Sequence, residues 1–492
     1  MNLRILLCLL PAVLWAGEPF GITITDESTG RGVPLVELEL VDGQHFVSDS
    51  AGRIAFEEPG LMGQPVFFTV RSAGYEYPKD GFGFAGVKLT PQPGGRAVVK
   101  LHRTAIAERL CRLTGRGIYR DSVLLGEKLP LNASPPEGAG RVVGQDSVQA
   151  VPYGGGIFWL WGDTMRAEYP LGNFRTSGAR SGMPKQPEQG VALQYFTDAS
   201  GFSRAMCPLP EKEGVVWMDG LVVVPESSGD LLLARYSRRE GLGKQFAQGI
   251  AVFDDKTEVF ESKLVLPLDE KWRMIHGHVT RLRDGDRDWL YFGEATLNTR
   301  VPATLAAVLD PARYEAWTCS APDGSLRRTP DGALDYAWRT DAAPVDSAVE
   351  ADWLKRGLIR AEECRFLPED VDTKKRITLH GGTVRWNAHR QRWVLLAVQI
   401  GGDASYLGEV WYSEATEPTG PWLRAVKVAT HDHMSFYNPV QHDFLDSGSS
   451  IYFEGTYTRT FSGNERATTP LYEYNQLLYR LDLDDPRLAR VR

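Results

Sequence analysis

The chain has 492 residues, 42% of them hydrophobic, which allows two or three domains with substantial cores. Its formal net charge of −8 is spread along the sequence, without a run of Lys or Arg. This pattern excludes nucleic acid and anionic membrane surfaces as expected partners.

The first 16 residues have the pattern of a secretory signal peptide. Arg4 precedes the apolar run ILLCLLPAVLWA, and a polar chain follows. The run is too short to span a bilayer. We therefore expect cleavage near Ala16, a secreted or periplasmic location and no membrane insertion.

Four cysteines would remain after export, and they allow three disulfide pairings: Cys111, Cys207, Cys319 and Cys364. An oxidising compartment favours disulfides, but buried free thiols are also common. The sequence leaves both outcomes open.

Residues 17–104 alternate apolar and polar positions between turn signals such as Asp42-Gly43, which predicts a small β-sandwich. The run GITITDESTGRGVPLVELELVDGQHFVSDSAGRIAF and the later FFTVRSAGYEY resemble the carboxypeptidase-regulatory-like sandwich often attached to secreted proteins. The resemblance implies a spacer or adhesive unit without chemistry. Residues 105–112 are predicted to be a linker, and residues 117–125 to offer a strand that could close the next domain.

A unit of two apolar runs joined by a polar turn recurs five times further along the chain. The units run from 146 to 163, 219 to 236, 278 to 294, 382 to 399 and 438 to 455, so four steps are 17 residues and one is 16. Hairpins repeated in this way are typical of propeller blades. We therefore predict an all-β chain in which a five-bladed β-propeller, residues 113–492, follows the small β-sandwich.

The hairpin ends are rich in polar residues. In a propeller, the start of the first strand and the end of the second meet on one face of the ring. The residues that this places around the central channel are Asp146, Asp163, Asp219, Arg235, His276, His278, Glu294, His380, Asn438 and Glu454. The alternative is that these side chains merely cap strands.

His276 and His278 could also bind a metal. Residues two apart on a strand face the same side, so both imidazoles could reach one divalent ion, although paired histidines also occur as ordinary polar residues. Apart from that ion, no cofactor is expected. The sequence has no GxSxG elbow, HExxH motif, phosphate loop or dinucleotide fingerprint, and those reaction classes lose support.

The largest insertion, about residues 301–377, is expected to hold outer strands of the third blade. Within it, Ser347-Ala-Val-Glu350 has the spacing of a capping box and predicts one short helix.

Carboxylates converging in a channel favour glycoside hydrolysis, which needs an acid and a base or nucleophile across the scissile bond. The five units, the strand end FWLWGDT and the unit YNPVQHDF…IYFEG resemble the five-bladed propeller glycoside hydrolases of the arabinanase type, over about residues 113–486. That family carries its catalytic carboxylates at the starts of inner strands, which implies Asp146 and Asp219. Its acid is a Glu on such a strand, whereas the other starts here are His278, Gly382 and Asn438.

The nearest substitutes for that acid are Glu294 and Glu454, at the ends of second strands. We predict Asp146 as the base, Glu294 as the acid, and Asp219 as the residue that orients the acid or raises its pKa. Substrate-binding roles are predicted for Asp163, Arg235, His278, His380, Asn438 and Glu454.

The predicted function is that of an exported glycoside hydrolase acting on a polysaccharide or oligosaccharide, with a carbohydrate as its partner. Two alternatives remain: a non-catalytic carbohydrate-binding or scaffold propeller, and a metal-dependent hydrolase or lyase based on His276, His278 and His380. The sequence makes no prediction of oligomeric state.

Overall fold

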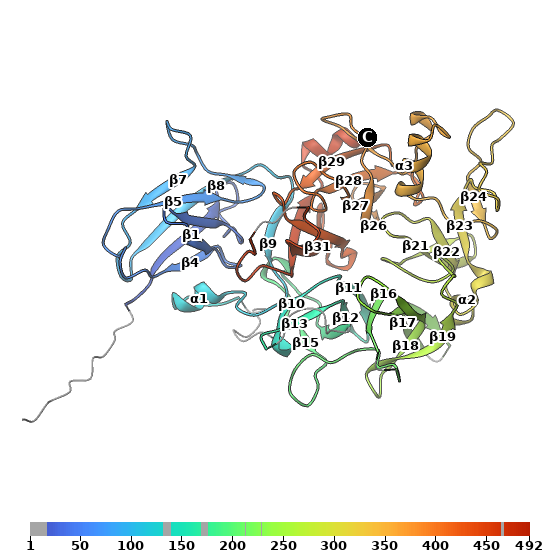
Figure 1. The fold of residues 1–492 in the computed structure, drawn as a ribbon, viewed down its shortest axis with the longest axis horizontal. Coiled ribbons are helices and arrows are strands. Elements are labelled where there is room, and N and C mark those ends of the chain that lie inside the picture. Colours follow the sequence, from blue (N-terminus) through green and yellow to red (C-terminus); the bar gives the residue numbers. More distant parts are fainter. Residues whose placement is uncertain (1–16, 131–138, 169–175, 212, 228, 464–466) are drawn as a thin grey trace, which may run out of the picture.

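The computed structural model describes residues 17–492 except 131–138, 169–175, 212, 228 and 464–466 (Figure 1). The predicted signal peptide therefore lies outside the described residues. The regular secondary structure of the described chain is mostly β-strand with little helix, as predicted. It forms a small two-sheet domain, followed by five sheets arranged around a centre.

The N-terminal domain is a sandwich of two four-stranded sheets. One sheet has the order β4-β1-β8-β6 and the other β3-β2-β5-β7. The strands are β1 Phe20–Asp26, β2 Glu37–Leu40, β3 His45–Val47, β4 Arg53–Phe56, β5 Val66–Arg71, β6 Tyr75–Glu76, β7 Gly86–Leu89 and β8 Arg96–Arg103. Alternate residues of both sheets, among them Ile22, Leu38 and Phe68, fill one buried core.

Each predicted hairpin forms the first two strands of one of the five sheets. The hairpins are β11 Gln149–Tyr153 with β12 Gly156–Trp161, β16 Val215–Glu226 with β17 Gly229–Arg239, β20 Thr280–Asp284 with β21 Arg287–Phe292, β26 Leu379–Asn387 with β27 Arg392–Gln399, and β30 Ser435–Gln441 with β31 Ser450–Thr458. We number the sheets as blades 1 to 5 in that order.

Further strands complete the blades. They are β14 Ser177–Ser181 and β15 Gln194–Tyr195 in blade 1; β18 Gln245–Asp254 and β19 Val259–Leu266 in blade 2; β22 Thr299–Pro302, β23 Glu315–Thr318 and β24 Ala337–Arg339 in blade 3; β28 Val410–Ala415, β29 Arg424–Ala429 and β25 Glu369–Asp370 in blade 4; and β32 Asn475–Asp482 in blade 5. A separate ribbon pairs β10 Val142–Gln145 with β13 Thr164–Arg166.

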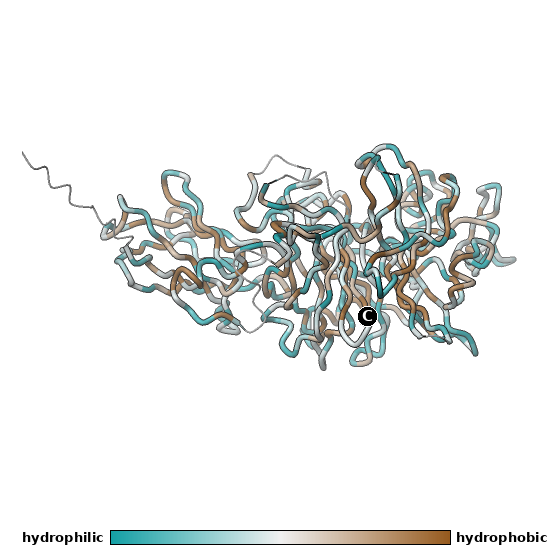
Figure 2. Tube along the Cα trace, turned by 90° about the horizontal axis from the view of Figure 1, so that it is seen from below, coloured by the Kyte–Doolittle hydropathy of each residue, from teal (hydrophilic) through white to brown (hydrophobic). Residues whose placement is uncertain are grey.

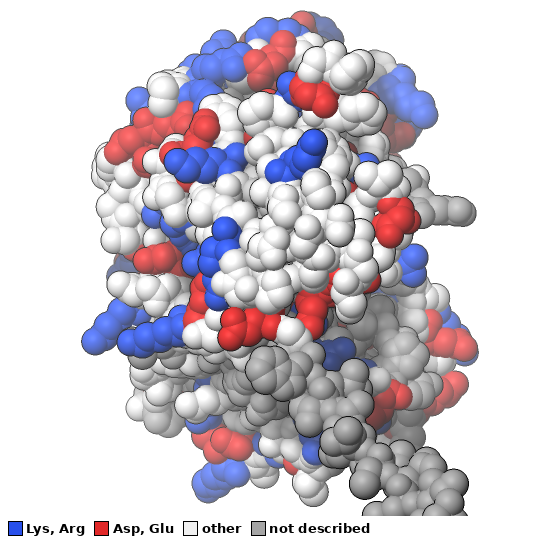
Figure 3. All heavy atoms as spheres, turned by 90° about the vertical axis from the view of Figure 1, so that its left-hand side faces the viewer, with Lys and Arg blue, Asp and Glu red and all other residues white. Residues whose placement is uncertain are grey.

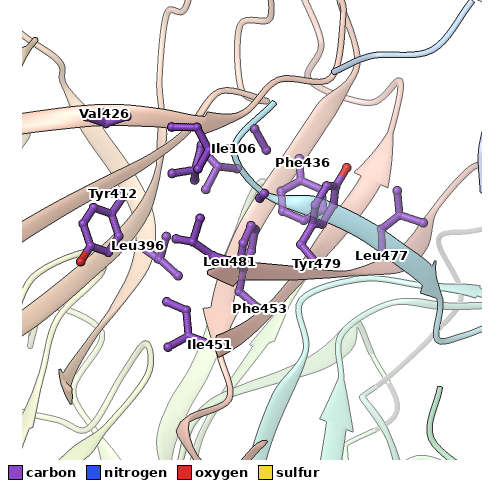
Figure 4. Close-up of a cluster of buried hydrophobic side chains, with 14 of the residues drawn as sticks. Ile106, Leu396, Tyr412, Val426, Phe436, Ile451, Phe453, Leu477, Tyr479 and Leu481 are labelled. Atoms are coloured by element: carbon purple, nitrogen blue, oxygen red, sulfur yellow. The ribbon is translucent and has the colours of Figure 1, made fainter. Parts of the chain in front are cut away.

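Five buried cores lie between neighbouring blades and close the ring. Phe158 and Leu160 of β12 pack toward blade 2, whereas Trp159 and Trp161 of the same strand pack toward blade 5. The three other cores join blades 2 and 3, 3 and 4, and 4 and 5. Figure 4 shows the core between blades 4 and 5. Because β12 is buried on both faces, its sequence is a continuous apolar run rather than an alternation.

The same pattern appears along the whole tube in Figure 2, where hydrophobic segments run through the sheets and hydrophilic segments lie mainly in the connections. On the face shown in Figure 3, Lys and Arg are interspersed with Asp and Glu. No helix in the described part of the chain is both long enough and apolar enough to cross a membrane.

The strand that closes the ring is not the predicted one. Strand β9, Glu108–Arg112, pairs with β32 and completes blade 5, although it lies within the range expected to be a linker. Residues 120–124, expected as part of a closing strand, form helix α1, Arg120–Leu124. All five residues of β9 are buried, as the closing strand of a ring requires.

Buried polar contacts join the sandwich to the ring. Arg109 of β9 is only 2% exposed and donates to the carbonyl oxygens of Pro34 (3.0 Å) and Ala73 (3.2 Å) and to Ser72 Oγ (2.6 Å). The Asp49 carboxylate accepts the backbone N–H and the hydroxyl of Ser122 in α1 at 2.7 and 2.8 Å. The segment between the domains is thus a packed junction.

The predicted helix in the insertion is α3, Ser347–Lys355, but its cap differs. Asp346, not Ser347, is the N-cap, because its carboxylate accepts the N–H of Val349 at 2.8 Å. The other helical segments are α2 Leu305–Val308 and the 3₁₀ turns η1 Ala139–Arg141, η2 Pro187–Gln189, η3 Pro311–Arg313, η4 Ala361–Glu363, η5 Asp443–Leu445 and η6 Pro486–Val491.

The disulfide alternative is not found. Cys111, Cys207, Cys319 and Cys364 are all buried free thiols. Burial raises the pKa of the Cys111 and Cys207 thiols to about 12, so they remain protonated and inert at neutral pH.

The position of β9 leads to a test with two fragments. Residues 105–492 should fold without the sandwich, whereas residues 113–492 should not, because the shorter fragment lacks β9 and leaves the edge of β32 unpaired. Circular dichroism and size-exclusion chromatography would compare them. A misfolded 105–492 fragment would contradict the domain boundary, and a folded, monomeric 113–492 fragment would contradict the closing role of β9.

Candidate active site

The ring surrounds a cavity of about 810 Å³ into which most of the predicted site residues project. Eight of the ten line it: Asp146, Asp163, Asp219, Arg235, His278, Glu294, His380 and Asn438. The hairpin ends therefore converge, although these residues span nearly 300 positions of the chain.

Bulges at the starts of the first strands direct these side chains. The register shifts between Asp219 and Val222 in β16, between Leu379 and Gly382 in β26, and between Tyr437 and Val440 in β30. A bulge bends its strand and re-aims the side chain beside it. Three of the five hairpins thus have a bulge beside the cavity.

Two glycines allow blades 2 and 3 to approach at the cavity. Gly220 has φ 65° and Gly277 has φ 61°, and a Cβ on Gly220 would lie 2.9 Å from the His276 backbone nitrogen. The Gly277 N–H donates to Asp219 Oδ2 at 3.3 Å. This close approach fixes one carboxylate oxygen of Asp219.

Asp146 is held by three hydrogen-bond donors. Its Oδ2 accepts the hydroxyls of Tyr474 at 2.5 Å and Tyr437 at 2.8 Å, and its Oδ1 accepts the backbone N–H of Asp163 at 2.8 Å. Burial raises the pKa of Asp146, while these donors oppose the rise because they stabilise the carboxylate. The side chain is thereby fixed with its anionic form supported by the protein.

Asp163 lies beside Asp146, and its pKa is also raised. Burial, followed by repulsion from the Asp146 carboxylate, raises the pKa of Asp163 to about 7. One donor, the indole Nε1–H of Trp217 at 2.8 Å, partly offsets this effect. Asp163 therefore holds its proton up to a pH near 7, and the charge of Asp146 is one cause of this.

Asp219 forms an ion pair across its own hairpin. Arg235 Nη1 lies 3.5 and 3.4 Å from the two carboxylate oxygens. The two residues are direct partners in the β16–β17 ladder. Asp219 is thus held by a guanidinium and a backbone N–H.

Glu294 is exposed within the cavity, and this differs from the expected environment. The sequence argument placed it against an apolar strand able to enclose a protonated carboxyl, but its side chain is open to the cavity. Burial lowers the pKa of the nearby His380, and the Glu294 carboxylate opposes that shift. Glu294 is free to meet a ligand directly.

His278 and Asn438 contribute neutral groups. Burial lowers the pKa of His278 to about 3, assisted by repulsion from Arg385 and His442, so its imidazole is uncharged at neutral pH. Asn438 has φ 51° and donates its amide N–H to Ser147 Oγ at 2.8 Å. Both side chains can hydrogen-bond a hydroxyl without adding charge.

The structure corrects two of the predicted positions. Glu454 is not a cavity residue: it is fully buried, and its Oε1 lies 2.6 Å from Nε2 of the equally buried His442. His276 is also absent from the lining; its Nδ1 lies 3.1 Å from the Met274 carbonyl oxygen and its ring packs on Phe292. Both residues belong to the packing around the cavity.

The metal alternative for His276 and His278 is therefore not supported, because His278 lines the cavity and His276 does not. Among the described residues, no group of three or more His, Cys, Asp and Glu side chains is placed to hold a metal ion.

Several lining residues were missed by sequence reasoning. Tyr437, Tyr474 and Trp217 hold the carboxylates, while Tyr406 and Phe461, 46% and 47% exposed, offer aromatic faces. Tyr406 and Phe461 lie in connections between strands, and the repeated hairpin units do not predict where such connections run. For Tyr437, the signal was its place directly before Asn438.

Comparisons with known proteins found only distant structural similarities. No family model matches the chain, and no curated protein matches its sequence. Similar solved structures include an exo-β-1,3-galactanase from Phanerochaete chrysosporium, at a TM-score of 0.37 and 10% identity, covering 70% of this chain and 61% of that chain. A second is arabinanase Arb43A from Bacillus subtilis, at a TM-score of 0.33 and 12% identity, covering 68% and 93%. The GH43_1 enzyme from Xanthomonas citri complexed with xylose is similar at a TM-score of 0.33 and 11% identity, covering 68% and 86%.

The pKa of Asp163 leads to a pH prediction. Its folded-state pKa lies above the unfolded value, so the folded protein binds the proton more tightly and loses stability as pH rises from about 4 to about 7. Asp163→Asn removes this loss. As pH rises through this window, the unfolding free energy of the variant minus that of wild type should increase by up to about 1.4 kcal/mol per pH unit.

Urea unfolding at five pH values between 4 and 8 would measure the difference. Asp230→Asn, an exposed carboxylate at the β16–β17 turn, is the matched control and should show no such trend. A constant difference between Asp163→Asn and wild type across the window would contradict the raised pKa.

The Glu454–His442 pair leads to a stability prediction. Glu454→Ala should lower the unfolding free energy by about 1–3 kcal/mol, because it leaves the buried Nε2 of His442 without its partner. Glu454→Gln, which can still hydrogen-bond, should cost less. Thermal and urea unfolding would show this, and an unchanged stability of Glu454→Ala would contradict a structural role.

Proposed function

We propose that this protein is an exported glycoside hydrolase that cleaves a polysaccharide or oligosaccharide within the cavity of the ring. One observation carries the proposal: four carboxylates from three blades, Asp146, Asp163, Asp219 and Glu294, face a single cavity. Glycoside hydrolysis requires such a set, with one carboxyl group to protonate the leaving oxygen and another to act as base or nucleophile.

The walls of the cavity fit the same substrate class. Sugar rings present an apolar face as well as hydroxyl groups, and exposed aromatic rings can cover that face. Trp217, Tyr406 and Phe461 supply aromatic surface, and His278 and Asn438 supply neutral hydrogen-bonding groups. A volume of about 810 Å³ lies within the usual range for small-ligand sites.

In the proposed mechanism, Asp146 is the base and Glu294 is the acid. Asp146 is preorganised by three donors that favour its charged form. Glu294 comes from blade 3 and is open to the cavity; a bound sugar that excludes water would raise its pKa and retain the proton for the leaving group. Asp219, paired with Arg235, would orient the acid or raise its pKa through its charge.

Asp163 replaces Glu454 as the rival for the acid. It already has a pKa of about 7 without a ligand, which suits proton donation near neutral pH. Its position beside Asp146, rather than across the ring, favours Glu294. The two are separable by experiment: if Asp163 is the acid, Asp163→Asn should lower kcat by roughly 10²–10⁴-fold at every pH, and if Glu294 is the acid, Glu294→Gln should do so instead.

Export is part of the proposal and is supported by the apolar run before Ala16. Buried, protonated thiols are compatible with an oxidising compartment, because they react slowly. The mass of the mature protein recovered from the periplasm or the medium would show whether residues 1–16 are removed.

Substitution of the reacting pair tests the proposed activity. Asp146→Asn and Glu294→Gln should each lower kcat by roughly 10²–10⁴-fold on a substrate found by screening a polysaccharide panel for new reducing ends, because each deletes a proton-transfer partner. Glu454→Gln should retain kcat per folded molecule. Glu261→Gln, an exposed carboxylate on β19, is the control for the charge change.

Near-wild-type turnover by either variant would show that the role of that residue is wrong. If no glycan in the panel is cleaved while glycans still bind, the non-catalytic carbohydrate-binding propeller would replace the hydrolase.

A further inference from the structure

Strand β17 lines the cavity with a row of three polar side chains. Arg235, Ser237 and Arg239 alternate with residues that face away, so all three project into the cavity. The row lies on the extension of the β16–β17 hairpin beyond Asp219: Arg235 pairs with Asp219, Ser237 with Trp217 and Arg239 with Val215. It ends near the turn at Gly241 and Leu242, which also lines the cavity.

The row lacks sufficient partners within the protein. Ser237 is only 7% exposed, and its Oγ makes no hydrogen bond. The Nε–H groups of Arg235 and Arg239 are likewise buried without an acceptor. Unmatched buried donors cost free energy, so a ligand or ordered water that accepts from them would be stabilised.

Arg239 is the charge in this row that has no carboxylate partner. Arg235 is paired with Asp219, but among the described residues no Asp or Glu oxygen lies within 4.0 Å of the Arg239 guanidinium. Its Nη2 donates instead to the carbonyl oxygens of Leu242 (3.3 Å) and Gly243 (3.2 Å), and its Nη1 to Gln245 Oε1 (3.4 Å). These contacts hold the planar fork in place and leave its positive charge uncompensated.

The cavity is therefore electrically divided. Its carboxylates gather at the ends of the hairpins, at the level of Asp219, whereas Arg239 lies four residues further along β17, about 13 Å away at the rise of an extended strand. An anionic group near Asp146 or Glu294 would be repelled. The same group near Arg239 would meet a fixed guanidinium.

We propose that the cavity accepts an acidic sugar chain, whose carboxylate or sulfate is held by Arg239 with Ser237 while a neighbouring sugar lies among the carboxylates. This assignment of the substrate class rests on the proposed glycoside hydrolase function. A fork of guanidinium N–H groups matches the paired oxygens of a carboxylate or sulfate, and such charge-assisted bonds are the stronger hydrogen bonds in proteins.

Binding of the full-length protein to immobilised oligosaccharides would test this proposal. The probes are oligogalacturonate, its uncharged methyl ester and a sulfated galactan fragment, which separate a carboxylate from a sulfate as the recognised group. Wild type should prefer at least one charged probe over the methyl ester by about 10- to 100-fold, which corresponds to one charge-assisted contact. The preference should shrink with added salt.

Arg239→Gln should abolish the preference while leaving affinity for the methyl ester within about twofold, because the methyl ester has no charge for the guanidinium to pair with. The matched control is Arg238→Gln, because Arg238 faces the other side of β17, where it lies over the Phe246 ring and donates to the Glu213 carbonyl oxygen. Ser237→Ala should weaken the preference without altering the turn, which covers the case in which Arg239→Gln does not fold.

The outcomes separate the two proposals. Equal binding of charged and uncharged probes by wild type, or a preference that survives Arg239→Gln and Ser237→Ala, would overturn the acidic substrate and leave the hydrolase intact. Selective binding without cleavage of any acidic glycan would retain the substrate class and overturn the hydrolase. Binding of none of the probes would overturn the acidic substrate.

Discussion

The whole site depends on the burial of each blade on both faces. Phe158 and Trp159 are neighbours in β12, yet one packs toward blade 2 and the other toward blade 5. Each blade therefore wedges between two others, and its angle around the axis is set by two cores at once. Because these interiors are close-packed, a shift of one blade would disturb both cores. The carboxylates can be brought together from distant parts of the sequence because the wedge fixes their positions.

Once packing has positioned the blades, hydrogen bonds and charges adjust the proton affinities of the carboxylates in the cavity. Asp146 and Asp163 differ by only their surroundings: one receives three donors, whereas the other receives one donor and the repulsion of its neighbour. Burial raises the pKa of both groups, but hydrogen-bond donors oppose the rise mainly at Asp146, whereas a neighbouring negative charge adds to it at Asp163. Unequal surroundings of this kind are a general route to acid and base functions at one pH.

The sequence predicted much of the architecture but less of the chemistry. The hairpins were predictable because runs such as IFWLW must be buried on both sides and because the two strands and polar turn recur with nearly the same length in each unit. Strand β9 was not, since its partner β32 lies at the opposite end of the chain and ERLCR has no strand alternation. Glu454 was placed wrongly because the prediction assumed that the ends of all second strands face the cavity. In the structure, Glu454 pairs with Val440, which lies beyond the bulge in β30, and its side chain points into the core. The hydrogen bond from Tyr474 to Asp146 could not be predicted either, because it depends on how the connection that carries Tyr474 folds back over the ring.

The ring also imposes an order on folding. Glu108 of β9 and Arg480 of β32 form an ion pair although 372 positions separate them. During synthesis, β9 leaves the ribosome long before its partner exists, while the sandwich that precedes it can already be complete. Contacts between segments so distant carry a large entropic cost until the intervening blades have formed. We therefore expect blade 5 to close late in assembly, and Arg109, which donates to the carbonyl oxygens of Pro34 and Ala73 in the folded protein, ties the closing strand to the sandwich.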